Sequence, residues 1–263
     1  MNTLKKLFVL CSFLYIPFSS MAWGVLGHRI IGQIADSYLT SKARRNIKAI
    51  LGDESIAMSS NWADFIKSDA SYNYLGPWHY LNVKDNLDEQ AFKNHLSADT
   101  LTDAYTKLNF IIGELKKPAL ENDKKKLYLR LLIHIAGDIH QPMHVSRAED
   151  QGGNKISLLW FNESSNLHRL WDEQLIGFQQ LSYTEYTDAI NHTTRQERKE
   201  WQQQPMQEWF FESYQISQGL YKEITQPDQK LSFRYNFDHI AIVNQQLLKA
   251  GVRLAGILNE LFG

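Results

Sequence analysis

Histidine and aspartate side chains recur along this sequence at spacings that suit metal coordination. His134 and Asp138 are four residues apart, and His168 and Asp172 repeat that interval. Residues four apart on an α-helix lie on one face, so each imidazole would point the same way as its carboxylate. A zinc ion would offset the cost of burying the first pair among apolar neighbours, although a simple His–Asp hydrogen bond explains that pair alone about as well.

Other candidate ligands lie near these pairs or near the N-terminus. His144 follows the helix-ending Pro142, Asp64 precedes His79, and His28 lies five residues after Trp23. Nitrogen and carboxylate ligands without thiolates suit zinc. The predicted metal ligands are Trp23, His28, Asp64, His79, His134, Asp138, His144, His168 and Asp172. This set exceeds what one or two tetrahedral ions require.

The first 22 residues have the pattern of a secretory signal peptide. Lys5 and Lys6 precede an apolar run over 7–18, and Ser20-Met21-Ala22 forms a small-x-small cleavage site. We therefore expect cleavage after Ala22, a domain over 23–263, and a secreted or periplasmic protein; the alternative is a buried N-terminal helix. The run is too short for a membrane span, and no second long one follows, so no membrane anchor is expected after processing.

Cleavage would give Trp23 a chemical role. Its free α-amino group and its carbonyl oxygen could chelate a metal together with His28, so the site would be complete only after export. The alternative is that Trp23 is a buried aromatic residue at a terminus. The only cysteine, Cys11, would leave with the signal peptide. A protein exported without disulfides needs another source of stability, and bound metal is one.

Composition describes an ordinary globular chain. The 263 residues include 28 Lys and Arg against 29 Asp and Glu, and 43% are hydrophobic. These values exclude a disordered, collagen-like or coiled-coil protein. A formal net charge of −1 argues against a protein that grips duplex DNA by neutralising many phosphates. Any nucleic-acid role must therefore rest on a local site.

The elements that would position these residues are mostly helices. Apolar residues at helical spacing predict helices from about Ile30 to Leu39 and over 42–51, 61–68, 101–115, 124–140 and 237–261. Gln141-Pro142 ends the fifth, because proline cannot continue the hydrogen-bond ladder. Only residues 155–161 alternate enough for a short β-hairpin, and 191–204 read as a solvated helix or loop. The prediction is a mainly α, single helical domain with at most a short β-hairpin.

The motifs that carry these residues resemble one known family. They are Trp23-Gly24-x-x-Gly27-His28, Asn61-Trp62-Ala63-Asp64, Trp78-His79-Tyr80, His134-Ile135-Ala136-Gly137-Asp138-Ile139-His140-Gln141-Pro142-Met143-His144, Gly152-Gly153-Asn154 and Asn166-Leu167-His168-x-x-Trp171-Asp172. In this order they resemble the zinc-dependent S-one/P-one type nucleases, secreted single-strand nucleases and 3′-nucleotidases of the phospholipase C/P-one nuclease superfamily. The match covers more than half of the chain after Ala22.

The resemblance implies a helical domain with three zinc ions in a cleft. One ion would take Asp64, His79, His134 and one oxygen of Asp138. A second would take Trp23, His28 and the other oxygen of Asp138. The third would take His144, His168 and Asp172.

The resemblance also implies the chemistry. Zinc lowers the pKa of bound water to about 7, and the resulting hydroxide would attack phosphorus and leave 5′-phosphates. Asp64, Asp138 and Lys67 would be the catalytic residues, with Lys67 near the scissile phosphate, where relatives often have arginine. Single-stranded DNA, RNA and 3′-nucleotides would be the substrates of an enzyme expected to be a monomer without protein partners.

Base recognition would rest on three further residues. Tyr80 matches an aromatic position that stacks on a base, while Asn82 and Asn154 match positions that bind base edges. Stacking is worth about 1–3 kcal/mol per base and needs an unstacked base, which favours single strands. Ordinary cleft lining explains Tyr80 and Asn82 equally well.

Two other functions compete with a nuclease. A zinc phospholipase C has the same fold, but it places its first histidine farther from the N-terminal Trp and closes its third site with Glu rather than the Asp found at Asp172. A non-catalytic periplasmic zinc-binding protein more often has flexible His-rich runs, which are absent here. His95, His140, His192 and His239 have no comparable partners in the sequence, and His140 is expected to be structural.

Overall fold

Helices form most of the chain in the computed structural model, which describes residues 23–263. The α-helices are α1 (Val25–Ser37), α2 (Ser41–Leu51), α3 (Ile56–Ser59), α4 (Trp62–Phe65), α5 (Glu89–Ser97), α6 (Ala104–Leu115), α7 (Asn122–Asp138), α8 (Leu167–Arg169), α9 (Leu175–Gly177), α10 (Tyr183–Ile190), α11 (Arg195–Gln203), α12 (Met206–Glu223) and α13 (Phe233–Phe262). The 3-10 helices are η1 (Ile66–Ser68), η2 (Ala70–His79) and η3 (Pro142–His144), and η4 (Leu170–Gln174) is a π-helix. The predicted signal peptide lies outside the described residues.

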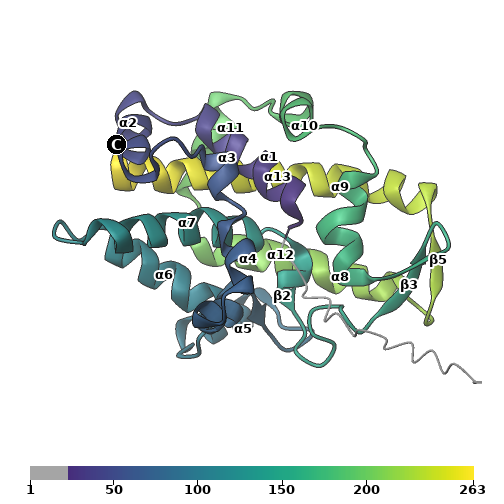
Figure 1. The fold of residues 1–263 in the computed structure, drawn as a ribbon. Coiled ribbons are helices and arrows are strands. Elements are labelled where there is room, and N and C mark those ends of the chain that lie inside the picture. Colours follow the sequence, from purple (N-terminus) through teal and green to yellow (C-terminus); the bar gives the residue numbers. More distant parts are fainter. Residues whose placement is uncertain (1–22) are drawn as a thin grey trace, which may run out of the picture.

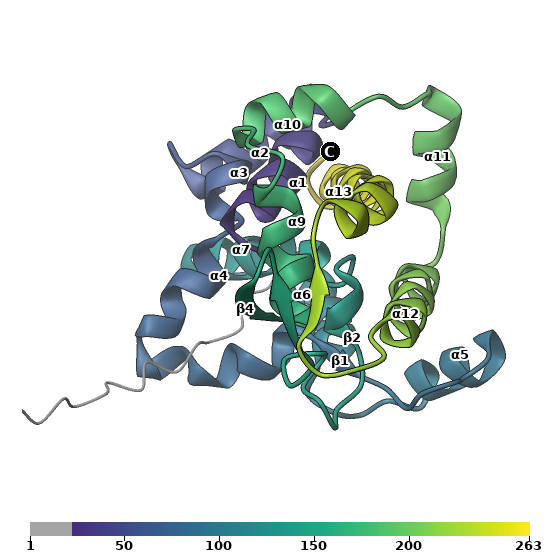
Figure 2. The ribbon, with the colours of Figure 1, turned by 90° about the vertical axis from the view of Figure 1, so that its right-hand side faces the viewer.

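The long helix α13 crosses the whole molecule, and α1 packs against it (Figure 1). Figure 2 looks almost along α13 and shows α10, α11 and α12 arranged around it. The contact between α1 and α13 is close at Gly251, where an added Cβ would lie 2.5 Å from Cβ of Ile34. Glycine is therefore needed there for α1, which carries His28, to approach the α13 backbone.

Helix α7 is buried around its whole circumference toward its C-terminal end. Every residue from Leu131 to Asp138 is buried, so His134 and Asp138 lie in the interior rather than on a surface face. The carbonyl oxygens just beyond the helix have partners on other elements: Ser213 donates to Ile139 O at 2.6 Å, and Gln246 donates to His140 O at 2.9 Å. These bonds satisfy groups that a helix end would otherwise leave unpaired.

Two small sheets connect segments that are distant in the sequence. Strand β1 (Leu81–Asn82) pairs in parallel with β2 (Val145–Ser146), which places the segment after His79 beside the segment after His144. Strand β3 (Ser157–Trp160) pairs antiparallel with β4 (Glu163–Asn166), as the hairpin prediction requires, and in parallel with β5 (Gln229–Leu231). The third strand is an addition to the predicted hairpin.

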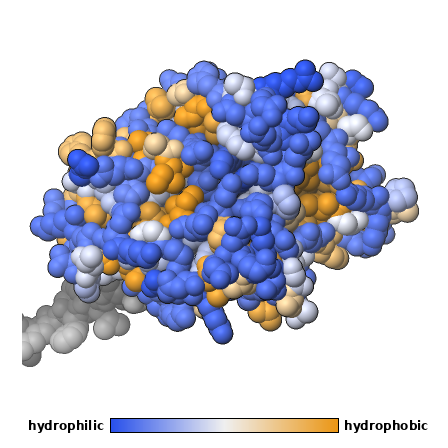
Figure 3. All heavy atoms as spheres, turned by 180° about the vertical axis from the view of Figure 1, so that it is seen from behind, coloured by the Kyte–Doolittle hydropathy of each residue, from blue (hydrophilic) through white to orange (hydrophobic). Residues whose placement is uncertain are grey.

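The predicted fold class is confirmed, because the structure is mainly helical and its strands are few and short. Each predicted helix has a counterpart within a few residues of its bounds. Helix α11 has no buried residue, which agrees with the solvated segment expected at 191–204. The face opposite to that of Figure 1 is largely hydrophilic, with separate apolar patches (Figure 3).

A pair of aspartates before α6 gives a testable dependence of stability on pH. Asp103 caps α6 by accepting from Thr106 N at 2.9 Å, and burial together with Asp99 raises the pKa of Asp103 to about 7. A carboxyl group whose pKa is raised on folding stabilises the protein at low pH, and this contribution is lost as the pH rises from about 4 through 7.

We expect Asp99→Asn to raise Tm by about 2 °C at pH 8 and to leave it unchanged at pH 4. The variant removes the neighbouring negative charge but keeps an oxygen that can accept from Leu101 N, as Asp99 does at 2.9 Å. Thermal unfolding at both pH values measures the effect, and Asp53→Asn on an exposed turn serves as the control. An equal shift at both pH values would show that charge repulsion is not the cause.

Candidate metal centre

Asp138 lies at the centre of the first ligand cluster. Its Oδ1 is 3.1 Å from His28 Nε2, and its Oδ2 is 3.0 Å from His79 Nδ1 and 3.2 Å from His134 Nε2. The imidazoles come from α1, from the end of η2 and from α7. The two oxygens of one carboxylate therefore face different histidines, as a carboxylate shared between two ions would.

Asp64 completes this cluster from α4. Its Oδ1 is 3.7 Å from His134 Nε2 and 2.6 Å from Lys67 Nζ. The rings of His28 and His134 are stacked with their centroids 4.0 Å apart. Asp64 is thus close both to the ligands predicted for one ion and to His28, which was predicted for another.

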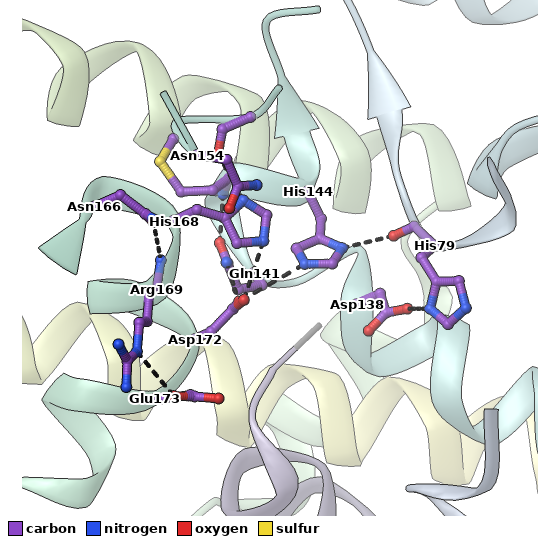
Figure 4. A network of polar contacts seen from close by, with 12 residues as sticks. His79, Asp138, Gln141, His144, Asn154, Asn166, His168, Arg169, Asp172 and Glu173 are labelled. Atoms are coloured by element: carbon purple, nitrogen blue, oxygen red, sulfur yellow. Dashed lines mark hydrogen bonds and ion pairs between the residues drawn. The ribbon is translucent and has the colours of Figure 1, made fainter. Parts of the chain in front are cut away.

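The second cluster joins His144, His168 and Asp172. Asp172 Oδ2 is 3.0 Å from His168 Nε2, and Asp172 Oδ1 is 3.7 Å from His144 Nε2 (Figure 4). His168 lies on α8 and Asp172 on η4, so the predicted i, i+4 pair is present but spans a change from α-helix to π-helix. Single π turns inside helices are frequent at functional sites.

Backbone carbonyl groups fix which nitrogen of three imidazoles faces the clusters. Nδ1 of His134 donates to Ser60 O at 2.6 Å, Nδ1 of His144 to His79 O at 2.7 Å, and Nδ1 of His168 to Gly152 O at 2.6 Å. A carbonyl oxygen can only accept, so each neutral ring keeps its Nε2 lone pair directed at the cluster. Metal-binding histidines are held in this way.

The carboxylates control the charge of both clusters. Burial opposes ionisation, but the facing imidazoles hold the pKa of Asp138 well below its usual value, and His168 and His144 lower the pKa of Asp172 to about 2. Burial lowers the pKa of His79 to about 4. Although burial acts in the same direction on His144, Asp172 and Asp138 raise the pKa of His144 to about 9. The buried carboxylates are therefore ionised and require positive charge beside them.

The donor atoms fit metal ions. Three groups each hold ligand atoms within 4.8 Å of one another: His28, Asp64 and His134; His79, His134 and Asp138; and His144, His168 and Asp172. Several of these buried atoms have no hydrogen-bond partner, namely His28 Nε2, Asp64 Oδ2, His79 Nε2, Asp138 Oδ1, His144 Nε2 and His168 Nε2. Buried nitrogen and oxygen atoms without protein partners suit zinc, which offsets their desolvation.

The N-terminal segment runs past the second cluster. Trp23 is fully buried, and Gly24 N donates to Asp172 O at 2.9 Å. A Cβ added at Gly24 would lie 3.2 Å from the same oxygen, and one added at Gly27 would lie 3.2 Å from Trp23 Cβ. The two glycines therefore let the chain before His28 pack tightly against the turn that holds Asp172.

A family model built on the sequences of the S1/P1 nucleases matches residues 23–263 of this chain. The chain belongs to the S1/P1 nuclease family. Endonuclease 2 of Arabidopsis thaliana is 31% identical over 282 aligned residues, which cover 95% of this chain and 94% of the relative. Nuclease S1 of Aspergillus oryzae is 32% identical over 64% of this chain and 61% of its own length, and nuclease P1 of Penicillium citrinum is 28% identical over 62% and 63%.

Family membership confirms the resemblance and makes the protein a hydrolase, a nuclease that acts on nucleic acids. The histidine and aspartate clusters fit the metal dependence of a S1/P1 nuclease. Within residues 23–263, no helix is both long and apolar enough to cross a membrane.

The residues predicted to contact substrate lie at differing depths around the ligands. The side chain of Lys67 is 26% exposed, Tyr80 is 39% exposed and Asn82 is exposed. Asn154 is half-buried, lies beside His168 in Figure 4 and donates to Gln151 O at 2.8 Å. Their roles toward substrate stay predictions.

His140 and His239 have their polar partners outside both clusters of the S1/P1 centre. His140 is buried, donates to Ala136 O at 2.8 Å, and has its Nε2 3.0 Å from Arg253 Nη1. His239 does have an acidic partner, because its Nε2 is 2.9 Å from Glu223 Oε2. The expectation that His239 lacks a comparable partner was therefore wrong: its partner is 16 residues away on α12, beyond the reach of helical spacing.

Sequence reasoning missed Gln141 as part of the S1/P1 site. This residue is fully buried, and its side-chain amide nitrogen donates to Asp172 Oδ1 (Figure 4). Its amide oxygen accepts from Met143 N. The position within the long histidine motif was a signal, but nothing local linked it to Asp172. Gln141 thus orients the predicted ligand Asp172 through a hydrogen bond that joins the segment after α7 to η4.

We expect Gln141→Leu to weaken metal binding at the second cluster by about 10–100-fold, as loss of a supporting hydrogen bond to a ligand does. Titration of chelator-treated protein with zinc, followed by calorimetry, measures the affinity. Gln179→Leu is the control, because Gln179 follows α9 and its side-chain amide donates to Leu175 O and to Asn236 Oδ1 rather than to a metal ligand. Equal affinities in the Gln141 variant and the wild type would exclude this orienting role.

Proposed function

We propose that this S1/P1 nuclease is a zinc-dependent phosphodiesterase that cleaves single-stranded DNA and RNA to products with 5′-phosphates, and that it also acts as a 3′-nucleotidase. The observation that supports it most is the grouping of unpartnered buried nitrogen and oxygen atoms in two adjoining clusters with Lys67 and Tyr80 nearby. Three zinc ions, held as the family resemblance divides the ligands, would use all of them.

Each residue has a role that follows from its position. Zinc, when bound, supplies Lewis acidity toward phosphoryl oxygens and water. Asp138, fully buried between His28 and His79, would keep both ligands in place with its two oxygens. Lys67 restrains Asp64 through its 2.6 Å contact, and because its side chain is 26% exposed it could also meet a phosphate. A lysine offers a point charge there rather than the fork of an arginine.

The residues predicted to bind bases support a preference for single strands. Tyr80 follows the ligand His79 directly and is 39% exposed, so its ring is available to a base. Asn82 and Asn154 carry amides that can bond base edges. A base inside a duplex is already stacked and paired, so only an unpaired base can use this arrangement.

A nucleic-acid cleavage assay on protein that starts at Trp23 tests this function. We expect chelator-sensitive cleavage of single-stranded DNA and RNA with 5′-phosphate ends, slower cleavage of duplex, and release of phosphate from a 3′-mononucleotide. Phosphatidylcholine, assayed in parallel, distinguishes a phospholipase C. Zinc binding without hydrolysis of any phosphodiester would favour the non-catalytic alternative.

We further propose that residues 1–22 are removed during export and that the Trp23 amine is then a metal ligand. Protein starting at Trp23 should bind one more metal ion than protein with a single alanine before Trp23, because a peptide nitrogen is a poor ligand. The extended protein should be at least about 100-fold slower, given that metal catalysis contributes several kcal/mol. An alanine added after Gly263 is the control. Equal metal content in all three proteins would contradict this role.

A further inference from the structure

A chain of aromatic rings lies next to the ligand clusters but makes no part of them. Trp62 contacts Tyr72 edge-on at 5.5 Å between centroids, Tyr72 stacks on Tyr74 at 6.3 Å, and Tyr74 meets Trp78 edge-on at 5.8 Å. These residues come from α4 and η2, the segment that also supplies Asp64 and His79. The proposed nuclease mechanism leaves this chain of rings without a role.

Helix α6, which packs against η2, extends the rings with a cation and a further aromatic residue. Lys107 Nζ lies 5.1 Å from the ring centroid of Trp78 and 5.5 Å from that of Phe110. Phe110 in turn contacts Tyr128 of α7 edge-on at 5.8 Å. Two elements, η2 and α6, therefore contribute to one group of rings and a cation, which we call the aromatic platform: Tyr72, Tyr74, Trp78, Lys107 and Phe110.

The platform is open at Tyr74 and Phe110, whereas Trp78 is buried and Lys107 is half-buried. Tyr74 is 52% exposed and Phe110 is 42% exposed. Over residues 23–263 no carboxylate pairs with Lys107, and the hydroxyls of Tyr72 and Tyr74 have no hydrogen-bond partner. The nearby Arg130, by contrast, is engaged with Glu54 at 2.5 Å. Exposed ring faces beside an unpaired ammonium group offer stacking and a phosphate contact together.

The platform is continuous with the candidate metal centre. Trp78 directly precedes the ligand His79, and Trp62 is two residues before Asp64. Successive Cα atoms are about 3.8 Å apart, so Trp78 of the platform and Trp62, which contacts the platform at Tyr72, lie one and two residues from metal ligands. Tyr80 stands on the other side of His79. A strand bound at the clusters could therefore continue over the platform.

We propose that the aromatic platform binds the nucleotides of a single strand that flank the cleaved phosphodiester. Bases would stack on Tyr74 and Phe110, and Lys107 between them would contact the backbone phosphate. This combination of rings and cations binds single strands without regard to sequence, since every base has a π-face. The proposal rests on the proposed single-strand nuclease function and adds to it a dependence on strand length.

The test compares binding and cleavage by the zinc-loaded protein. A fluorescent twelve-nucleotide strand with phosphorothioate linkages, which are charged but slowly hydrolysed, measures binding by anisotropy. Loss of both rings in Tyr74→Ala/Phe110→Ala should raise Kd at least about tenfold, whereas Tyr74→Phe should keep the wild-type Kd. Lys107→Gln should reduce the slope of log Kd against log salt by about 0.7.

Cleavage gives a second measure, the ratio of kcat/KM on a twelve-nucleotide strand to kcat/KM on a dinucleotide. We expect the Tyr74→Ala/Phe110→Ala variant to lower this ratio at least about tenfold. The matched control is Arg234→Ala/Phe237→Ala at the N-terminal end of α13. Phe237 is 75% exposed, and the Arg234 guanidinium lies 5.8 Å from its ring. The control should keep the wild-type ratio.

The outcomes separate this proposal from the one on which it rests. Wild-type Kd, salt slope and cleavage ratio in the platform variants would overturn it, as would an equal loss in the Arg234/Phe237 control. If the wild type bound the strand through Tyr74 and Phe110 but cleaved no single strand, the platform would stand and the proposed nuclease function would fail.

Discussion

Replacing Asp138 with asparagine is expected to lower the rate of phosphodiester cleavage by about 1,000-fold or more and to reduce the bound metal. Asp138 is the only carboxylate that contacts His28, His79 and His134 together within residues 23–263. Asparagine keeps the size of the side chain but removes its charge and directs an NH2 group at a nitrogen or a metal. Metal catalysis contributes several kcal/mol, and each 1.36 kcal/mol is a factor of ten in rate.

Metal analysis by mass spectrometry, together with kcat/KM on single-stranded DNA, measures the effect of Asp138→Asn. Asp103→Asn is the matched control, because Asp103 is also buried but its carboxylate caps α6 through Thr106 N, and within residues 23–263 it pairs with none of the ligands. The control should keep its metal and its rate. A variant at Asp138 with full metal content and a rate within tenfold of wild type would remove Asp138 from the centre of the proposed site.

Removal of metal by a chelator is expected to abolish activity and to lower Tm by more than about 10 °C. Without ions, the lone pairs and carboxylates of both clusters face one another in the interior. A buried polar group without a partner costs about 1–3 kcal/mol, and about 1 kcal/mol shifts Tm by 2–4 °C in a domain of this size. Metal that binds the folded state in preference to the unfolded state stabilises the folded state, so its removal lowers Tm.

Differential scanning calorimetry with and without chelator measures this loss, and added metal tests its reversal. Zinc should restore both Tm and activity, while magnesium should restore neither, because magnesium prefers oxygen ligands and octahedral geometry. Unchanged Tm after complete removal of metal would mean that the clusters are stable through their own hydrogen bonds. Full recovery with magnesium would contradict the choice of zinc.

Local pattern was sufficient to predict the helices that carry three of the nine ligands, Asp64, His134 and Asp138. His134 and Asp138 lie on one face of α7 because the interval of four residues follows from helix geometry. The helix ends before Pro142, as proline requires. Helix α12, which was not predicted, is buried on several sides and lacks a clean apolar stripe. Strand β5 was missed because its partner β3 lies about seventy residues earlier.

The sequence by itself determined which residues could bind metal and which of them share an element, because spacing along a helix fixes the directions of side chains. It also indicated the family, since motif order is a property of the chain. Only the tertiary structure decided that Gln141 holds Asp172 and that Lys107 lies over Trp78. The meeting of Asp138 with His28 and His79 was implied by the family resemblance, but no spacing along the chain could show it, and the structure places those side chains together. Those contacts join separate elements, and which elements meet depends on burial of apolar surface across the whole domain rather than on any local pattern.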